Sequence, residues 1–337
     1  MKRFVTTILV LLLIAATVLS GCTQSEKDTE KEKRISVICT VFPQFDWVRE
    51  ILGDSTDNVD LAPPLNSRID LHNYQPSVDD IIKISTCDLF IHVGGVSDGW
   101  VSDALAGATN KSMVVISLLD ALGDAVKIEE IVEGMEDDDH DHEEKDDDDD
   151  HDDEHGHEPE YDEHVWLSLK NAQILCRVIA GALSSLDAEN AETYGNNLAA
   201  YNNKLSALDS EYQAAVDSAA VRTLLFGDRF PFRYLADDYG IGYYAAFTGC
   251  SAETEASFET IVFLAVKMDE LNLRNIMVTE SSNKRIAETI IRESKNGNQR
   301  ILVMNAMQSV APGDVANGLT YLSIMESNLN VLKEALS

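Results

Sequence analysis

The sequence predicts an α/β protein of two (β/α)4 lobes, each with a parallel four-stranded sheet, joined by a long rigid linking helix. Short apolar runs alternate with helical segments over residues 35–117, and the same alternation returns over residues 223–336. Between them, residues 188–218 carry apolar side chains only at helical spacing. Strands that alternate with helices at this spacing indicate βαβ units and parallel sheets.

In the first lobe, each predicted strand is a short run rich in β-branched residues, as expected for a buried strand. These strands are residues 35–40, 59–62, 89–93 and 113–117. Pro43 begins a helix that Gly53 ends, and Ser77 is a suitable N-cap for the helix at 78–84. Further helices are expected near residues 100–105 and over 167–186.

The second lobe repeats this order. Its expected strands are residues 223–226, 243–247, 275–279 and 301–304, and its expected helices are 232–239, 257–271, 284–293 and 319–336. The linking helix places Leu198, Tyr201, Leu205, Leu208 and Tyr212 in one stripe, over roughly 45 Å at 1.5 Å per residue. We therefore assign residues 35–187 to the first lobe, 188–218 to the linking helix and 219–337 to the second lobe.

The amino terminus is expected to be a processing signal. Residues 1–21 combine a basic start, an apolar run and small residues before Cys22, which is typical of a lipoprotein signal peptide. We expect cleavage before Cys22 and acylation of this cysteine, which would anchor the chain to the bilayer, with residues 22–34 as a tether. The alternatives are an ordinary signal with a chance cysteine and an uncleaved anchor.

The charge of the chain is strongly negative and unevenly distributed. The formal net charge is −33, and residues 136–163 alone hold nineteen carboxylates and one lysine. Such acidity excludes nucleic-acid binding, which needs Lys and Arg. The acidic segment has no apolar area to form a core, so we expect a disordered loop. It contains five of the eight histidines, namely His140, His142, His151, His155 and His157.

Two interpretations of this loop stay open. It is either a solvated acidic run that favours solubility, or a low-affinity metal collector beside a tighter site. The histidines favour the collector, because imidazole binds zinc and other transition metals and solubility needs none.

The remaining histidines and cysteines define the candidate metal site. His72 lies between a strand and a helix, and His164 lies at the end of the acidic loop. His92 lies inside an apolar strand and is expected to be a core or edge histidine and not a ligand. Cys39, Cys87, Cys176 and Cys250 form no CxxC motif. We therefore predict no thiolate metal site, and disulfides are not required.

Several motifs resemble one known family. They are VFPQFDWVREILGD, then PP…D-x-H-x-Y-x-P-S around His72, DLFIHVGG, the His-rich loop, and HVWLSLKNA from His164. FRYLADDYG, VTESSN and GLTYLSIMESNL follow later in the chain. Over residues 35–337 the chain resembles the cluster A-I (ZnuA-like) metal-binding lipoproteins of ABC importers.

The resemblance implies one divalent ion between the two lobes, with His72 and His164 as the first two ligands. The third family position falls on Arg229, which cannot bind a cation, and the fourth falls on Asn305, a poor zinc ligand. Asp228 and Glu280 could replace them, because each lies close to the end of a predicted strand; the alternative is a solvated acid or a salt bridge. Glu253 and Glu255 are weaker candidates.

These features predict an extracytoplasmic, membrane-anchored lipoprotein that captures a metal ion and delivers it to an ABC permease. We expect a monomer and no enzymatic activity. Zinc is favoured because His-rich loops accompany zinc in the family, with manganese as the alternative. Two other functions stay open: a metal-dependent hydrolase, which would need an open metal position and a general base, and a surface metal buffer or adhesin that acts through the loop.

Overall fold

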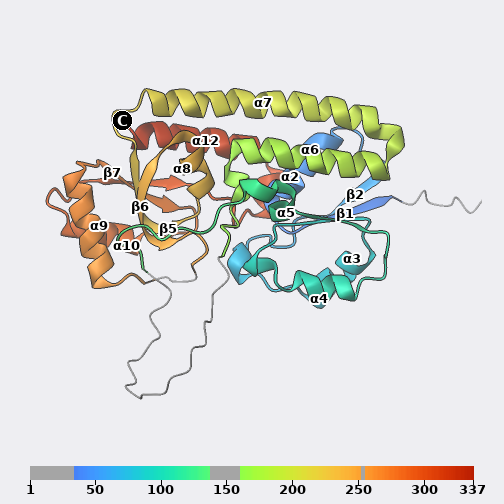
Figure 1. Cartoon of the computed structure of the whole chain (residues 1–337), viewed down its shortest axis with the longest axis horizontal. Helices are drawn as coiled ribbons and strands as arrows, with labels where there is room; N and C mark the ends of the chain where they lie inside the picture. The colour runs from blue at the N-terminus through green and yellow to red at the C-terminus, as the bar shows by residue number, and fades with distance from the viewer. Residues whose placement is uncertain (1–33, 137–159, 252–254) are drawn as a thin grey trace, which may run out of the picture. The chain divides into compact units, whose positions relative to one another are not determined.

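The computed structural model describes residues 34–136, 160–251 and 255–337, and residues 34–337 belong to one compact unit. Within it, two parallel four-stranded sheets lie at opposite ends of a layer of long helices (Figure 1). The predicted fold class is confirmed. The signal peptide, Cys22, the tether up to residue 33, Glu253 and the five loop histidines lie outside the described residues.

The first sheet has the strand order β2-β1-β3-β4, and every neighbouring pair is parallel. Its strands are β1 (Ile35–Cys39), β2 (Val59–Leu61), β3 (Leu89–His92) and β4 (Val114–Ser117). The connecting helices are α2 (Phe42–Leu52), α3 (Val78–Thr86) and α4 (Val101–Ala106), and α5 (Leu118–Leu122) follows β4. Ser77 caps α3 as predicted, because its side chain accepts a hydrogen bond from the backbone N–H of Asp80.

The second sheet has the order β6-β5-β7-β8 and is also parallel. Its strands are β5 (Thr223–Phe230), β6 (Gly242–Thr248), β7 (Asn275–Thr279) and β8 (Arg300–Met304). Its helices are α8 (Arg233–Tyr239), α9 (Phe258–Glu270), α10 (Arg285–Glu293), α11 (Pro312–Ala316) and α12 (Tyr321–Ala335).

Strand β5 is longer than its sequence predicts. The register shifts between Phe226 and Arg229, and pairing with β6 then resumes up to Phe230. Asp228 therefore lies within the strand, at this irregularity, and not after it. The apolar run ends at Phe226, so hydropathy alone did not reveal the extension.

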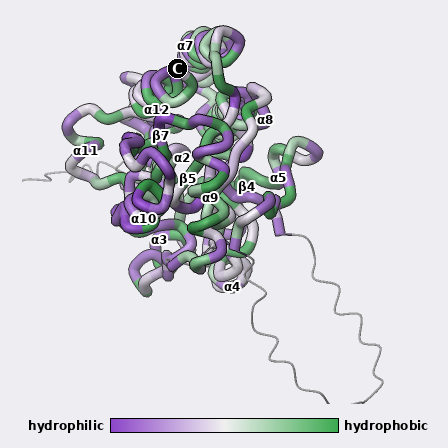
Figure 2. The backbone as a smooth tube through the Cα atoms, turned by 90° about the vertical axis from the view of Figure 1, so that its left-hand side faces the viewer, coloured by the Kyte–Doolittle hydropathy of each residue, from purple (hydrophilic) through white to green (hydrophobic). Residues whose placement is uncertain are grey.

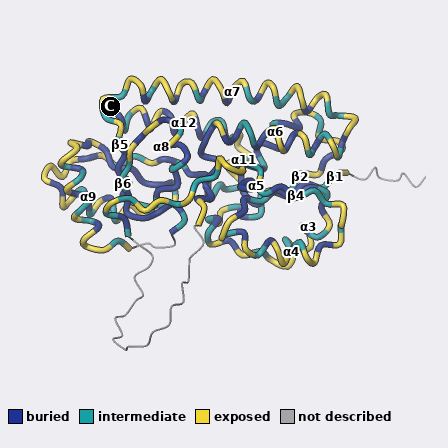
Figure 3. The backbone as a smooth tube through the Cα atoms, viewed as in Figure 1, coloured by how far each residue is buried: buried dark blue, intermediate teal, exposed yellow. Residues whose placement is uncertain are grey.

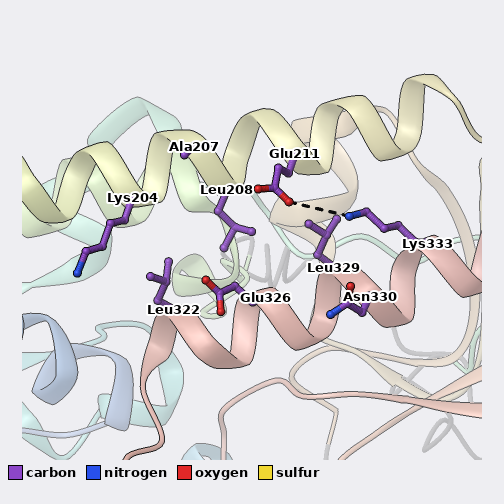
Figure 4. Close-up of a pocket in the computed structure, with 9 residues that line it drawn as sticks. All are labelled: Lys204, Ala207, Leu208, Glu211, Leu322, Glu326, Leu329, Asn330 and Lys333. Carbon is purple, nitrogen blue, oxygen red and sulfur yellow. Dashed lines mark ion pairs between the residues drawn. The ribbon is translucent and has the colours of Figure 1, made fainter.

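Helix α7 (Ala191–Asp217) extends over both sheets, whereas α6 (Leu169–Leu186) lies on the side of the first sheet and α12 on the side of the second (Figure 1). The stripe predicted for α7 is buried at Tyr201, Leu205, Leu208 and Tyr212, whereas the opposite face is exposed (Figure 3). A hollow between α7 and α12 contains an ion pair from Lys333 to Glu211 at 4.0 Å (Figure 4). The hollow is lined by lysine, glutamate, asparagine and apolar side chains and contains no histidine or cysteine.

One apolar cluster extends from the first sheet to the second and includes residues from Val37 to Leu336. Smaller clusters lie on the outer faces, one under α9 and α10 and one under α3 and α4. The outer helices are correspondingly amphipathic, and α10 is mostly hydrophilic along its trace (Figure 2), with only Ala287 and Ile290 buried. The long helices bury their apolar faces in the large cluster and join the cores of the two lobes.

Five short 3-10 helices complete the described structure: η1 (Leu71–Asn73), η2 (Val96–Asp98), η3 (Gly123–Ala125), η4 (Val165–Leu167) and η5 (Ala188–Asn190). Among the described residues, no helix has both the length and the apolar character to cross a membrane.

Candidate metal site

His72 is held by contacts to its backbone and to one ring nitrogen. It lies in η1, which Asp70 caps by accepting a hydrogen bond from the His72 backbone N–H at 3.1 Å. On the ring, Nδ1 lies 2.8 Å from Ser97 Oγ and 3.5 Å from Glu163 Oε2. With Ser97 Oγ as the acceptor for an Nδ1 proton, Nε2 keeps its lone pair.

His164 is fixed by a single carboxylate. Asp162 Oδ1 accepts from the His164 backbone N–H at 2.8 Å and from ring Nδ1 at 2.9 Å. The ring is fully buried and packs edge-on against Trp166, with 5.4 Å between ring centroids. A carboxylate on Nδ1 sets the tautomer and makes Nε2 more basic, as around metal-bound histidines.

The Nε2 atoms of the two rings face each other. His72 Nε2 lies 3.2 Å from His164 Nε2, although 92 residues separate them along the chain. Two lone pairs at this distance repel unless a proton or a cation lies between them. The prediction that these imidazoles converge is therefore supported by their geometry.

The electrostatic environment of the two rings is unequal. Burial, together with the neighbouring His164, lowers the pKa of His72 to about 3. Burial also opposes protonation of His164, but the nearby carboxylates of Asp162, Glu163 and Glu129 raise the pKa of this ring above its usual value. The acidic side of the site thus favours positive charge, whether from a proton or from a metal ion.

A third possible donor atom lies beside the two imidazoles, on a cysteine that the sequence analysis did not place at the site. His72, His164 and Cys250 each offer one donor atom, and these atoms all lie within 4.8 Å of one another. Among the described residues this is the only such group of His, Cys, Asp and Glu. The prediction of no thiolate metal site considered only cysteine spacing, which carries no information about a donor supplied singly by a distant loop. The structure places the Cys250 thiol beside the two histidines.

Asp228 and Glu280 lie outside this group, and their oxygens have other partners. Asp228 Oδ2 accepts from the backbone N–H and the hydroxyl of Thr279, at 3.0 and 2.6 Å. Glu280 accepts from the backbone N–H groups of Ala306 and Gln308, at 2.7 and 3.2 Å. Metal binding by either carboxylate is untested, and both already organise the loops after β7 and β8. Glu255 is exposed.

The two positions where the family pattern is broken also have structural partners. Arg229 Nη2 pairs with Asp70 Oδ2 at 2.6 Å, and its Nη1 donates to the backbone oxygen of Ser251 at 3.3 Å. Asn305 Oδ1 accepts from the Met307 backbone N–H at 2.8 Å. Neither side chain is directed to the histidines by a described contact.

Three further residues shape the site. Asp162 and Glu163 belong to the carboxyl end of the predicted disordered loop, yet both are buried, and Tyr161 forms an antiparallel bridge with Ile128. In the sequence, the position of Asp162 and Glu163 directly before His164 was the signal that could have indicated their place in the site. Gln308 Nε2 lies 2.7 Å from His164 Nε2, so the amide donates to the lone pair that a metal would use.

Glu163 is poorly solvated. Its Oε1 accepts from the Ser97 backbone N–H at 2.8 Å, whereas Oε2 is buried without a hydrogen-bond partner. Burial raises the pKa of this carboxyl group to about 7. His92, by contrast, pairs with Asp98 at 3.3 Å and lies outside the group, as predicted.

Comparisons with known proteins identify the family of this chain. Residues 37–335 match the family ZnuA, described as zinc-uptake complex component A, periplasmic. The high-affinity zinc uptake system protein ZnuA of Bacillus subtilis is 29% identical over 324 residues, covering 96% of this chain and 94% of the relative. The zinc-binding lipoprotein AdcA of Streptococcus pneumoniae is 29% identical, but this chain spans only 60% of its length.

A solved structure gives the same fold. The Zn(II)-bound ZnuA-like domain of Streptococcus pneumoniae AdcA superposes with a TM-score of 0.67 at 25% identity, covering 90% of this chain and 99% of that domain.

Proposed function

We propose, since this chain belongs to the ZnuA family of zinc-uptake components, that it captures one zinc ion between its two lobes and delivers it to a membrane permease of the ABC type. This role is that of a solute-binding component and not of an enzyme, in agreement with the sequence analysis. His72 and His164 are the proposed ligands. The proposal includes acylation at Cys22, which would hold the protein at the extracytoplasmic face of the membrane.

The observation that carries the proposal is the 3.2 Å separation of the two Nε2 atoms. A zinc ion binds imidazole nitrogen at about 2.0–2.1 Å with tetrahedral angles, which places two such nitrogens about 3.3–3.4 Å apart. The two rings therefore need almost no rearrangement to share one zinc ion. Each ring also has its Nδ1 proton directed to an acceptor, as metal-bound histidines require.

The surroundings support capture and release of a cation. Glu129, Asp162 and Glu163 contribute negative charge on the His164 side of the site. The amide of Gln308 donates to His164 Nε2 and must rotate before a metal ion binds.

The test is titration calorimetry with zinc on metal-free protein. We expect one tight site in the wild type and its loss in both His72→Ala and His164→Ala. His92→Ala is the matched control, because His92 is also a partly buried histidine paired with a carboxylate, yet it lies outside the ligand group. Equal affinity in the wild type and both ligand variants would contradict the proposal.

A second experiment separates transport from metal buffering by the acidic loop. Deletion of residues 137–159 removes all five loop histidines and leaves His72 and His164 in place. A transport component should retain its tight site and lose only weak capacity. If the deletion removes nearly all bound zinc, the loop itself is the functional part and the cleft assignment is wrong.

A further inference from the structure

Cys250 differs from the other cysteines that the structure describes. Cys39, Cys87 and Cys176 are fully buried in apolar surroundings, whereas Cys250 is partly exposed, and all four are free thiols. It lies on the loop after β6, and its sulfur is within 4.8 Å of the facing histidine nitrogens. A buried cysteine needs no function beyond packing, but this one faces a polar site.

We infer that Cys250 Sγ is the third protein ligand of the bound metal ion, and that it makes the site selective for zinc over manganese. This inference rests on the proposed function of the site. With Zn–N near 2.05 Å and Zn–S near 2.3 Å, tetrahedral coordination places sulfur about 3.6 Å from each nitrogen. The separations of up to 4.8 Å therefore exceed this value by roughly an ångström at most, which a loop can supply.

The loop that carries Cys250 is held against the histidines on both sides. The Cys250 backbone N–H donates to Glu129 Oε1 at 2.8 Å, and Arg229 donates to the backbone oxygen of Ser251. Gly249 permits the close approach, because a Cβ there would lie 3.1 Å from His164 Nδ1 and 2.9 Å from the backbone oxygen of Phe230. The position and the backbone of Cys250 are thus set by contacts that converge on the site.

Arg229 gives a reason for a ligand from this loop. Its guanidinium cannot bind a cation, and its pair with Asp70 leaves it beside the site as a fixed positive group. The side chain instead stabilises the segment that follows Cys250. In this chain, therefore, the end of β5 supplies a support for the loop, and the loop after β6 supplies the donor atom.

The chemistry of the donor determines the selectivity. On binding, the thiol loses its proton to solvent and the sulfur lone pair forms the bond to the metal ion, so one proton is released per ion bound through sulfur. Thiolate is a soft ligand that favours zinc, whereas manganese prefers carboxylate, carbonyl and water oxygens. A site with two imidazoles and one thiolate thus favours zinc.

Cobalt(II) is the spectroscopic probe for this inference, because it takes the place of zinc and reports sulfur coordination through a thiolate-to-metal charge-transfer band. Wild-type protein titrated with cobalt(II) should show this band, and Cys250→Ala should lose it. Cys87→Ala is the matched control: it also removes one thiol, but Cys87 is buried between Ile84 and Met113, away from the histidines.

Affinity gives a second readout. Zinc binding, measured by competition with a chromophoric chelator, should weaken in Cys250→Ala by at least about 100-fold, the upper end of what loss of an outer-shell partner costs. Manganese affinity should change little, so the ratio of the two affinities should fall by nearly the same factor. Cys87→Ala should leave both affinities unchanged.

The outcomes separate this inference from the proposed function. If cobalt(II) binds tightly and depends on His72 and His164, yet shows no sulfur band and no change in Cys250→Ala, the thiolate assignment is overturned and the proposed function stands. If wild-type protein binds neither zinc nor cobalt(II), both are overturned. Loss of the band together with zinc affinity in Cys250→Ala, in a variant with wild-type thermal unfolding, supports the inference.

Discussion

The hydrogen bond from His164 to Asp162 offers the most specific test of the site. Asp162→Asn preserves the size of the side chain and an oxygen that can accept from His164 Nδ1 and from the backbone N–H, but it removes the negative charge. Both hydrogen bonds, at 2.8 and 2.9 Å, are accepted by the same oxygen, Oδ1 of Asp162. The substitution therefore changes the basicity of Nε2 more than the position of the ring.

The expected magnitude follows from the burial of this pair. Loss of an outer-shell partner of a metal-bound histidine costs about 10–100-fold in metal affinity, which corresponds to about 1.4–2.7 kcal/mol at 25 °C. His164 is fully buried, so water cannot replace the lost charge. We therefore expect the loss of zinc affinity in Asp162→Asn to be near the upper end of this range at pH 8.

The effect should depend on pH in a defined direction. The carboxylates raise the pKa of His164, so in the wild type a proton competes with zinc for Nε2 once the pH falls below that raised value. In Asp162→Asn the pKa is lower, and this competition begins at lower pH. The ratio of zinc dissociation constants, variant over wild type, should be largest at alkaline pH and should shrink as the pH falls.

The assay is zinc competition with a chromophoric chelator between pH 6 and 8.5. Asp98→Asn is the matched control, because Asp98 is also buried and accepts from a backbone N–H and from a histidine ring, here Gly94 and His92. Zinc affinity should be unchanged in the control. An unchanged affinity in Asp162→Asn at every pH, with the fold intact, would refute the reasoning.

Three further predictions concern the other polar groups around the site. Burial raises the pKa of Glu163 to about 7, so the metal-free protein loses this group's contribution to stability as the pH rises from about 4.5 through 7. Glu163→Gln should therefore unfold at a higher temperature than the wild type at pH 8 and at nearly the same temperature at pH 4. An equal difference at both pH values would contradict this prediction. In Gln308→Glu a carboxylate replaces the amide that competes with zinc for His164 Nε2, and zinc affinity measured by calorimetry should rise about tenfold. Weaker binding would show that the amide does not compete with zinc. Glu280→Ala leaves two buried backbone N–H groups without an acceptor and should cost about 2–4 kcal/mol in denaturant unfolding; a loss below about 1 kcal/mol would mean that water replaces the carboxylate.

Local patterns in the sequence were sufficient for the elements of the fold. The strand Asn275–Thr279 was predicted to the residue, and the α7 stripe was predicted from Tyr201 to Tyr212. Both predictions succeed for one reason. Side chains two apart in a strand, or three to four apart in a helix, share a face, so the hydropathy of nearby residues indicates which face is buried. His72 and His164 were found because each lies beside a recognisable motif.

The rest of the site depended on the tertiary structure. Cys250 is 86 positions beyond His164, and no local pattern relates a lone cysteine to an imidazole that distant. In the sequence, Asp162 and Glu163 continue the acidic run that precedes them, and only packing shows that they are buried. At the irregularity in β5, the Asp228 carboxylate accepts a hydrogen bond from Thr279, and this irregularity arises from pairing between strands.

The sequence by itself therefore determined the two parallel sheets, the linking helix, the family and the two imidazoles, because periodicity and short motifs are properties of adjacent residues. The tertiary structure alone decided which third donor faces those imidazoles, which carboxylates orient them, and that the two lobes share one core. Each of these depends on loops and helix faces brought together from distant parts of the chain, where the energies of many long-range contacts determine the geometry.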